Sequence, residues 1–313
     1  MRILISNDDG IHAAGMRLLA AQLAPHCELL VVCPERASSA SSHSVTLHKP
    51  IRLHPLPDFA KEIGAEGCSV EAYSCSGKPG DSVTLGILHL AKDKPVDLVL
   101  SGINHGRNVA EDLTYSGTVG AALEGAVLGI PSVALSFDRD SGGSLRDAAL
   151  LTDLLLSALI YGATFPWHSE VLDRLSGAAL QGDILDGWPL AQLPRREGSA
   201  YPDPGAWWPS GIGQTPCLNV NLPGCELEEL QGIAWSIAGH REYRDVVKLA
   251  TDPRGKPYYW LVGDRITMEQ ELPGADTNHL LHNIVSVTPI SYDITNYLDR
   301  PRYQALFTER LGG

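Results

Sequence analysis

Two adjacent aspartates, Asp8 and Asp9, follow a short apolar run near the start of the chain and precede a glycine. Neighbouring carboxylates repel each other and are costly to remove from water unless a positive charge lies between them. A metal ion bound by both side chains removes that cost, whereas a solvated turn avoids it because the carboxylates stay in water. Taken alone, the tripeptide Asp-Asp-Gly is compatible with either arrangement.

Two further polar stretches lie where apolar runs end. PERASSASSHS occupies 34–44 and SGINHGRN occupies 101–108. In open parallel sheets, ligands bind where the carboxyl ends of the strands meet, so the aspartates, the serines and the asparagines are expected at one edge. Such an oxygen-only donor set suits Mg²⁺, Mn²⁺ or Ca²⁺ rather than zinc. A plain serine-rich loop and a simple strand exit are the alternative interpretations of these two stretches.

A candidate anion site follows in YSGTVGAALEG at 115–125. Ser116, Gly117 and Thr118 stand at the predicted start of a helix, where main-chain N–H groups, two hydroxyls and the helix dipole attract negative charge. The alternative is that Ser116 only caps the helix. A cation site beside an anion site is the arrangement needed for transfer of a phosphoryl group to water, because the cation activates the water and the donors stabilise the phosphoryl oxygens.

The elements that must position these residues are visible as apolar runs and as helical periodicity. Their alternation predicts a parallel sheet with helices on its faces, a doubly wound, Rossmann-like α/β fold. Asp81 is expected to be the N-cap of its helix. Predicted strands cover 2–6, 27–34, 95–102 and 131–137, and predicted helices cover 13–26, 81–92, 116–130 and 144–162.

The second half of the chain differs in composition and shows less regular periodicity. Between about 163 and 216 a long irregular excursion is expected, because much of this stretch is rich in proline, glycine and tryptophan. CLNVNLP at 217–223 predicts a strand that returns to the sheet. Beyond it, GIAWSIAG, YYWLVG and NIVSVTPI predict short strands of an antiparallel extension or hairpin arm, and 293–311 predicts a terminal helix. The expected division is a core at 1–230, followed at 231–313 by a β-hairpin arm and a C-terminal helix.

Composition narrows the classes of function. The chain has 313 residues, of which 44% are hydrophobic, and a formal net charge of -13. An acidic balance of this size disfavours binding to a nucleic-acid polymer or to an anionic membrane, although a metal can still attract a small anionic substrate. The N-terminal apolar run is too short for a signal peptide, so a cytoplasmic protein is expected.

The cysteines point to the same compartment. No CxxC pair occurs among them, which disfavours a zinc ribbon or a dense disulfide framework. Free thiols in a reducing cytosol are therefore expected. The six residues are Cys27, Cys33, Cys68, Cys75, Cys217 and Cys225.

The ordered motifs SNDDG, PER..S, SGIN.G.N and YSGTV.AA.EG resemble those of the survival protein E (SurE) family of nucleotidases. The resemblance continues with GKPGDSV, DPRGKPYYW, GADT and VSVTPI and covers roughly 1–137 and 217–295. It implies a metal-dependent phosphatase that releases phosphate from nucleoside 5′- and 3′-monophosphates, and in some members from short polyphosphate.

The resemblance also implies roles for individual residues. One divalent ion per subunit, Mg²⁺ or Mn²⁺, would be held by Asp8, Asp9, Ser39 and Asn104, and either aspartate would act on the attacking water. Ser39 is chosen by its spacing from PER, although Ser38, Ser41 and Ser42 crowd the same loop. The implied phosphate contacts are Asn108, Ser116, Gly117 and Thr118.

Several positions depart from the family pattern or stay open. Lys78 stands where the family usually has threonine, and it is either an extra phosphate contact or a solvated side chain. Trp207 and Trp208, in an excursion longer than that of compact members, either stack on a base or pack internally. Three histidines lie near the proposed site: His12, His43 and His105. His43 is a conceivable general acid.

The function predicted from these observations is hydrolysis of a phosphomonoester, with a nucleoside monophosphate as substrate. The alternatives are a broader phosphatase or exopolyphosphatase with the same residues, and a nucleotide-binding sensor without turnover. A nicotinamide-dependent oxidoreductase is disfavoured because NDDGIHAAG lacks the GxGxxG pattern. The family resemblance further implies a homodimer or homotetramer in which the hairpin arm and the C-terminal helix are exchanged between subunits.

Overall fold

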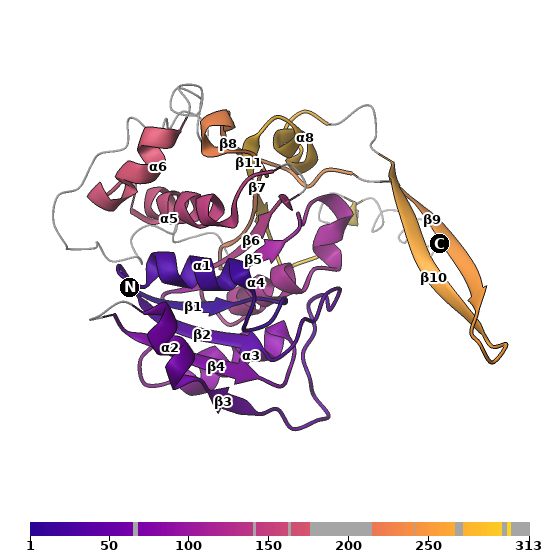
Figure 1. The fold of residues 1–313 in the computed structure, drawn as a ribbon, viewed down its shortest axis with the longest axis horizontal. Coiled ribbons are helices and arrows are strands. Elements are labelled where there is room, and N and C mark those ends of the chain that lie inside the picture. The colour runs from indigo at the N-terminus through magenta and orange to yellow at the C-terminus, as the bar shows by residue number, and fades with distance from the viewer. Residues whose placement is uncertain are drawn as a thin grey trace, which may run out of the picture.

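A nine-stranded, mostly parallel sheet forms the centre of the computed structural model (Figure 1). The structure describes residues 1–64, 68–139, 142–161, 164–175, 215–240, 242–266, 272–295 and 299–301. The strand order is β3-β4-β2-β1-β5-β6-β7-β11-β8. These strands are β1 (Arg2–Ser6), β2 (Glu28–Pro34), β3 (Leu53–Pro55), β4 (Val70–Cys75), β5 (Leu98–His105), β6 (Ser132–Phe137), β7 (Cys217–Leu222), β8 (Gly232–Trp235) and β11 (Ile284–Ile290).

The winding of this sheet reverses next to β1. From β1 the chain moves outward through β2 to β4, and then returns to pair β5 in parallel with the other side of β1. It continues outward through β6 and β7, also in parallel. The carboxyl ends of β1 and β5 therefore flank the point at which the strand order reverses, which is where open α/β sheets bind ligands.

Helices cover both faces of the sheet, as expected for a doubly wound fold. Ile3 and Ile5 of β1 pack into one core cluster with residues of α1 and α5, whereas Leu4, between them, packs into a second cluster with Val83 of α3 and Ala121 of α4. Strands buried on both faces read as continuous apolar runs, which is why β1 and β2 were predictable. The helices are α1 (Ala14–Leu23), α2 (Pro57–Ile63), α3 (Pro79–Leu85), α4 (Gly117–Val127), α5 (Leu145–Tyr161), α6 (Ser169–Arg174) and α8 (Asp276–Leu281).

Short helical segments connect these elements. They are a π-helical turn that continues α3 at Gly86–Leu90 and the 3₁₀ turns η2 (Ala110–Thr114), η4 (Pro166–His168) and η7 (Leu227–Glu229). None of the described helices is long and apolar enough to cross a membrane.

The prediction that Asp81 is an N-cap is wrong. Lys78 occupies the N-cap position of α3, and Asp81, two residues into the helix from Pro79, accepts the Lys78 main-chain N–H at 2.8 Å. A carboxylate in the first turn is favoured by the helix dipole, so the residue still serves the start of the helix. The π-helical turn then ends the helical stretch near its predicted limit.

The strands beyond residue 231 also differ from the prediction. β8 and β11 are members of the central sheet, in which β11 lies antiparallel to β7 and parallel to β8. Only β9 (Glu242–Thr251) and β10 (Pro257–Ile266) form the hairpin arm, which projects away from the sheet in Figure 1. The boundary expected at 231 therefore falls inside the sheet rather than at its edge.

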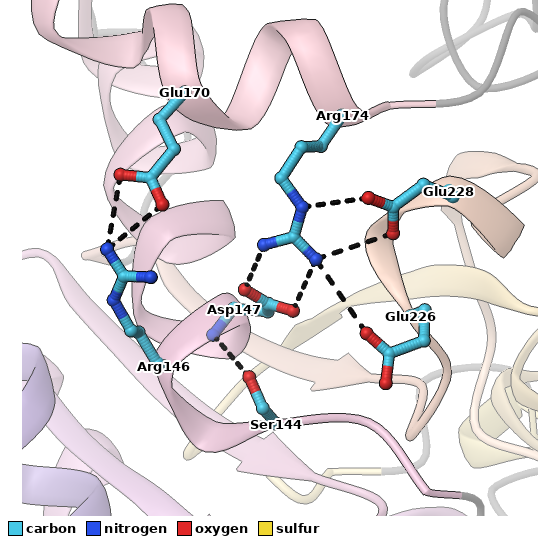
Figure 2. Close-up of polar contacts among 7 residues, drawn as sticks. All are labelled: Ser144, Arg146, Asp147, Glu170, Arg174, Glu226 and Glu228. Atoms are coloured by element: carbon cyan, nitrogen blue, oxygen red, sulfur yellow. Dashed lines mark hydrogen bonds and ion pairs between the residues drawn. The ribbon is translucent and has the colours of Figure 1, made fainter.

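A cluster of charged side chains around Arg174 connects α6 to α5 and η7. Arg174 of α6 donates two hydrogen bonds to Asp147 of α5, at 2.6 and 2.9 Å, and a third to Glu228 of η7 at 2.8 Å (Figure 2). These hydrogen bonds raise the pKa of Arg174, with the bond to Asp147 as the largest cause. Most of the excursion expected at 163–216 lies outside the described residues, including Trp207 and Trp208, and so does most of the predicted terminal helix.

All six cysteines are free thiols, as the sequence predicts. Cys33 and Cys217 lie inside the sheet, where burial raises the pKa of both thiols, that of Cys217 to about 12. Burial likewise raises the pKa of the Cys225 thiol to about 11. These groups are therefore protonated at neutral pH.

Candidate active site

The turn after β1 presents two aspartates in different environments. Asn7 closes the turn, because its side chain donates to the Gly10 carbonyl at 2.9 Å and accepts the Gly10 N–H at 3.2 Å. Gly10 has a φ of +95°, which favours glycine. Within this turn the Asp8 side chain points into the protein, with the residue only 5% exposed, whereas Asp9 is half-buried.

Asp8 is a buried carboxylate whose charge is only partly compensated. Burial raises its pKa and the charge of Asp9 raises it further, while hydrogen bonds from the Thr118 hydroxyl and main chain oppose the shift. The Thr118 hydroxyl donates to Asp8 Oδ1 at 2.5 Å. The start of α4 therefore supplies positive potential at this carboxylate, through the hydroxyl and the main chain of Thr118.

The end of β5 brings Asn104 and His105 to the same edge. The register of β5 against β6 shifts between Ser101 and Asn104, and such an irregularity re-aims the side chains that follow. The main-chain N–H of His105 then donates to Asp9 Oδ2 at 3.3 Å. Asn104 uses its side-chain N–H to bond the Gly106 carbonyl at 2.9 Å, so its Oδ1 is the atom left to act as a ligand.

The serine-rich loop after β2 lies against this turn. The Ser38 main-chain N–H donates to the Asp8 carbonyl at 2.7 Å. Ser39 is exposed, and its hydroxyl is not brought into a hydrogen bond with either aspartate. The Ser41 hydroxyl oxygen is buried beside Asp8 and Gly117 instead. Spacing alone gave no way to separate these neighbouring serines.

Helices α3 and α4 anchor the far half of that loop. The Ser42 hydroxyl donates to the Thr114 carbonyl at 2.7 Å, and His43 Nε2 donates to Glu124 at 2.8 Å. The hydrogen bond from His43 is the largest of the causes that lower the pKa of Glu124. Lys78 Nζ donates to Ser44 Oγ at 3.0 Å, which gives this unusual lysine a loop-holding contact. His43 is thus engaged with α4, and Glu124 is a positioning residue that the sequence did not reveal.

The helix predicted to begin at 116 is present as α4, which starts at Gly117. Ser116 is the N-cap, and its hydroxyl accepts the Val119 N–H at 3.1 Å. A methyl group placed on Gly117 would lie 2.8 Å from Asp8 Cβ, so only glycine lets the helix start come this close to the aspartate. Ser116, Gly117, Thr118 and Asp8 are therefore brought together in one place.

Asn108 is held by its main chain from a distant strand. Asn221 of β7 accepts the Asn108 N–H at 2.8 Å and donates to its carbonyl at 2.9 Å, while Asn219 donates to the same carbonyl at 2.8 Å. The Asn108 side chain donates to Ser136 of β6 at 2.7 Å. Two asparagines on one face of a buried strand were the available signal in CLNVNLP, which was interpreted only as a strand.

A buried aspartate fixes the loop between Asn108 and Ser116. Asp276, fully buried at the start of α8, accepts main-chain N–H groups of Ala110 at 3.1 Å and Gly239 at 2.8 Å. Because Ala110 lies in the turn that leads to α4, Asp276 ties this part of the candidate site to the far end of the sheet. His12, by contrast, is exposed and packs edge-on against Phe59 of α2.

The donor set fits a hard divalent cation. The carboxylates of Asp8 and Asp9 lie at the same sheet edge as Asn104. Asp8 is buried, and both its burial and the charge of Asp9 raise its pKa. The hydrogen bond that the Asn104 side chain donates uses its nitrogen and leaves its oxygen available. Hard cations prefer such oxygen ligands. Within the described ranges no group of three or more His, Cys, Asp or Glu side chains is placed to hold a metal ion.

Comparison with known proteins places this geometry in a family context. The family model for Survival protein SurE matches residues 3–245. A 5′-nucleotidase SurE from Synechococcus sp. (strain JA-3-3Ab) is 37% identical over 301 residues, which cover 95% of this chain and 94% of the relative. One from Thermosynechococcus vestitus is 35% identical, covering 94% and 92%. The crystal structure of SurE protein from Aquifex aeolicus is similar with a TM-score of 0.67 and 29% identity, covering 98% and 99% of the two chains.

Proposed function

Because this chain belongs to the survival protein SurE family, we propose that it is a 5′-nucleotidase, which hydrolyses nucleoside 5′-monophosphates to nucleoside and phosphate. The observation that carries the proposal is the meeting of Asp8 with the start of α4. A buried carboxylate that faces a helix N-terminus, near the reversal point of the sheet, supports a cation site next to an anion site.

The cation of this proposal is one Mg²⁺ or Mn²⁺ per subunit, held by Asp8, Asp9, Ser39 and Asn104. When bound, such an ion polarises a phosphoryl oxygen and lowers the pKa of water. Ser39 would need its exposed hydroxyl to turn toward the aspartates, whereas Asn104 already has its oxygen free. Either aspartate would act on the attacking water, and Asp9 is the more exposed of the two.

The phosphoryl group would lie against Asn108 and the first turn of α4, at Ser116, Gly117 and Thr118. The positive end of the helix dipole and the main-chain N–H of Gly117 stabilise negative charge that develops there. Thr118 orients Asp8 through its hydroxyl, and Asn219 with Asn221 fixes the position of Asn108. The rigid supports suit a site that must be preorganised.

The test is phosphate release from a panel of nucleoside 5′- and 3′-monophosphates and tripolyphosphate, with Mn²⁺, Mg²⁺ or EDTA. We expect release from the 5′-monophosphates that stops with EDTA and falls by roughly 100-fold or more in Asp8→Asn. Asp58→Asn is the matched control, since Asp58 is a highly exposed aspartate of α2. We expect the 3′-monophosphates to be hydrolysed as well, and the panel tests this and ranks the exopolyphosphatase alternative.

Activity that survives both EDTA and Asp8→Asn would refute the metal assignment. Failure of every substrate, with a folded protein that still binds metal, would favour the nucleotide-binding sensor instead.

The arm formed by β9 and β10 suggests the oligomeric state. Its strands contact chiefly each other, and large apolar side chains on it are exposed, among them Leu249 and Tyr259 on one face and Trp260 on the other. An isolated two-stranded hairpin is marginal in water, so these faces need cover. A second copy of this chain, in a homodimer or homotetramer, would provide it.

A further inference from the structure

The hydroxyl oxygen of Ser41 is buried and lacks a hydrogen-bond partner among the described residues. An unpaired buried hydroxyl is costly, so its position calls for a partner that binds there. The oxygen lies at the start of α4. A methyl group placed on Gly117 would be 2.5 Å from Ser41 Oγ and 2.9 Å from Asp8 Oδ2, so both oxygens border the same helix start.

The loop holds Ser41 firmly in this position. Its neighbours Ala40 and Ser42 have left-handed φ values of 55° and 54°, which turn the chain sharply on both sides. The Ser41 carbonyl accepts the Ser44 hydroxyl at 2.6 Å. Ser38 likewise bonds a main-chain carbonyl, that of Arg36, through its hydroxyl. The Ser41 hydroxyl therefore differs from those of Ser38, Ser42 and Ser44 in having its donor uncommitted, and from that of the exposed Ser39 in being buried.

We propose that Ser41 is a substrate-binding residue whose hydroxyl donates a hydrogen bond to a phosphoryl oxygen held at the first turn of α4. The inference rests on the proposed function and adds a residue to that site. Gly117 opens the helix, where the dipole is positive and favours an anion over a cation. The Ser41 hydroxyl, next to the main-chain N–H of Gly117, supplies a second donor to the phosphoryl oxygens. Two donors suit a phosphate better than they suit a metal ion.

The experiment measures binding of inorganic phosphate by calorimetry, in saturating Mn²⁺, to the full-length protein. Ser41→Ala should weaken phosphate binding roughly tenfold, the loss expected for one hydrogen bond to a charged group, and leave Mn²⁺ affinity unchanged. Ser38→Ala is the matched control and should bind phosphate as the unaltered chain does. Ser41→Cys, which keeps a weaker donor of similar size, should fall between the two and provides a second variant if alanine impairs folding.

Equal phosphate affinity in Ser41→Ala and the unaltered chain would overturn the proposal. So would a parallel loss of Mn²⁺ affinity, which would make Ser41 a metal ligand, or absence of phosphate binding in the unaltered chain. Hydrolysis of nucleoside monophosphates is assayed separately on the same samples. A chain that binds phosphate through Ser41 without hydrolysing nucleotides would refute only the proposed function.

Discussion

Asp8 is the residue whose environment most distinguishes the candidate site from an ordinary turn. A carboxylate with a raised pKa binds a proton in the folded state at a pH where the unfolded chain has already lost it. The free energy of unfolding of the metal-free protein should therefore fall as the pH rises from the ordinary aspartate range through the raised pKa. Urea unfolding in EDTA, measured across that interval, checks this slope.

The same reasoning predicts the behaviour of Asp8→Asn. Removing the buried charge should raise the melting temperature of the metal-free protein at neutral pH, since asparagine still accepts the Thr118 hydrogen bond. Added Mn²⁺ should stabilise the unaltered chain and leave the variant unchanged. A variant that melts lower than the unaltered chain in EDTA would show that the Asp8 charge is not a destabilising group.

Asn221 makes a second prediction at this scale. Asn221→Ala leaves the main-chain N–H of Asn108 without its acceptor in a buried place, which should cost about 1–3 kcal/mol of the free energy of unfolding. Because Asn108 would also shift, kcat/KM should fall at least about tenfold. Urea titration and steady-state kinetics measure both effects. Asn278→Ala serves as the control, because Asn278 of α8 makes none of the hydrogen bonds that hold Asn108. An Asn221→Ala variant as active as the unaltered chain would contradict the positioning role.

Several elements, and the meeting of two segments of the candidate site, were predictable from the sequence. The apolar runs of β1, β2 and β6 are buried on both faces, and the rule for strand ends correctly brought Asp8, Asp9 and the end of β5 together. No element was predicted for residues 45–76, where β3, α2 and β4 lie. β3 is a short, mostly exposed edge strand, and the neighbouring β4 has a mixed burial pattern, so neither forms a clear apolar run. The hydrogen bonds of Asn219 and Asn221 to Asn108 were not predictable either, since these partners are more than 100 residues away.

The cluster around Arg174 belongs to the scale of elements, because it joins α5, α6 and η7 (Figure 2). Arg174→Met keeps the length of the side chain and leaves the buried Asp147 carboxylate without its two hydrogen bonds. We expect a loss of about 1–3 kcal/mol in the free energy of unfolding, measured by urea titration. Arg146→Met, which breaks an exposed pair with Glu170, should change stability by less than about 1 kcal/mol.

For the whole molecule, the arm yields the clearest prediction. Replacing Leu249 and Tyr259, which face each other across β9 and β10, with Glu and Lys should lower the mass measured by light scattering at micromolar concentration. Arg254→Ser, in the turn of the arm, is the control. An unchanged mass in the double variant would mean that the arm does not hold subunits together.

The close approach at Gly117 also sets how this chain can diverge. Even alanine, the smallest replacement, would place its methyl group within 3 Å of Ser41 Oγ, Asp8 Cβ and Asp8 Oδ2 at once. The aspartate turn, the serine loop and the start of α4, which are far apart in the chain, thus pack closely around Gly117. A larger side chain in any of them would displace the other two. Substitutions at position 117 must therefore occur together with others. A larger side chain there is tolerated only if the serine loop and the turn that carries the aspartates both move away from it.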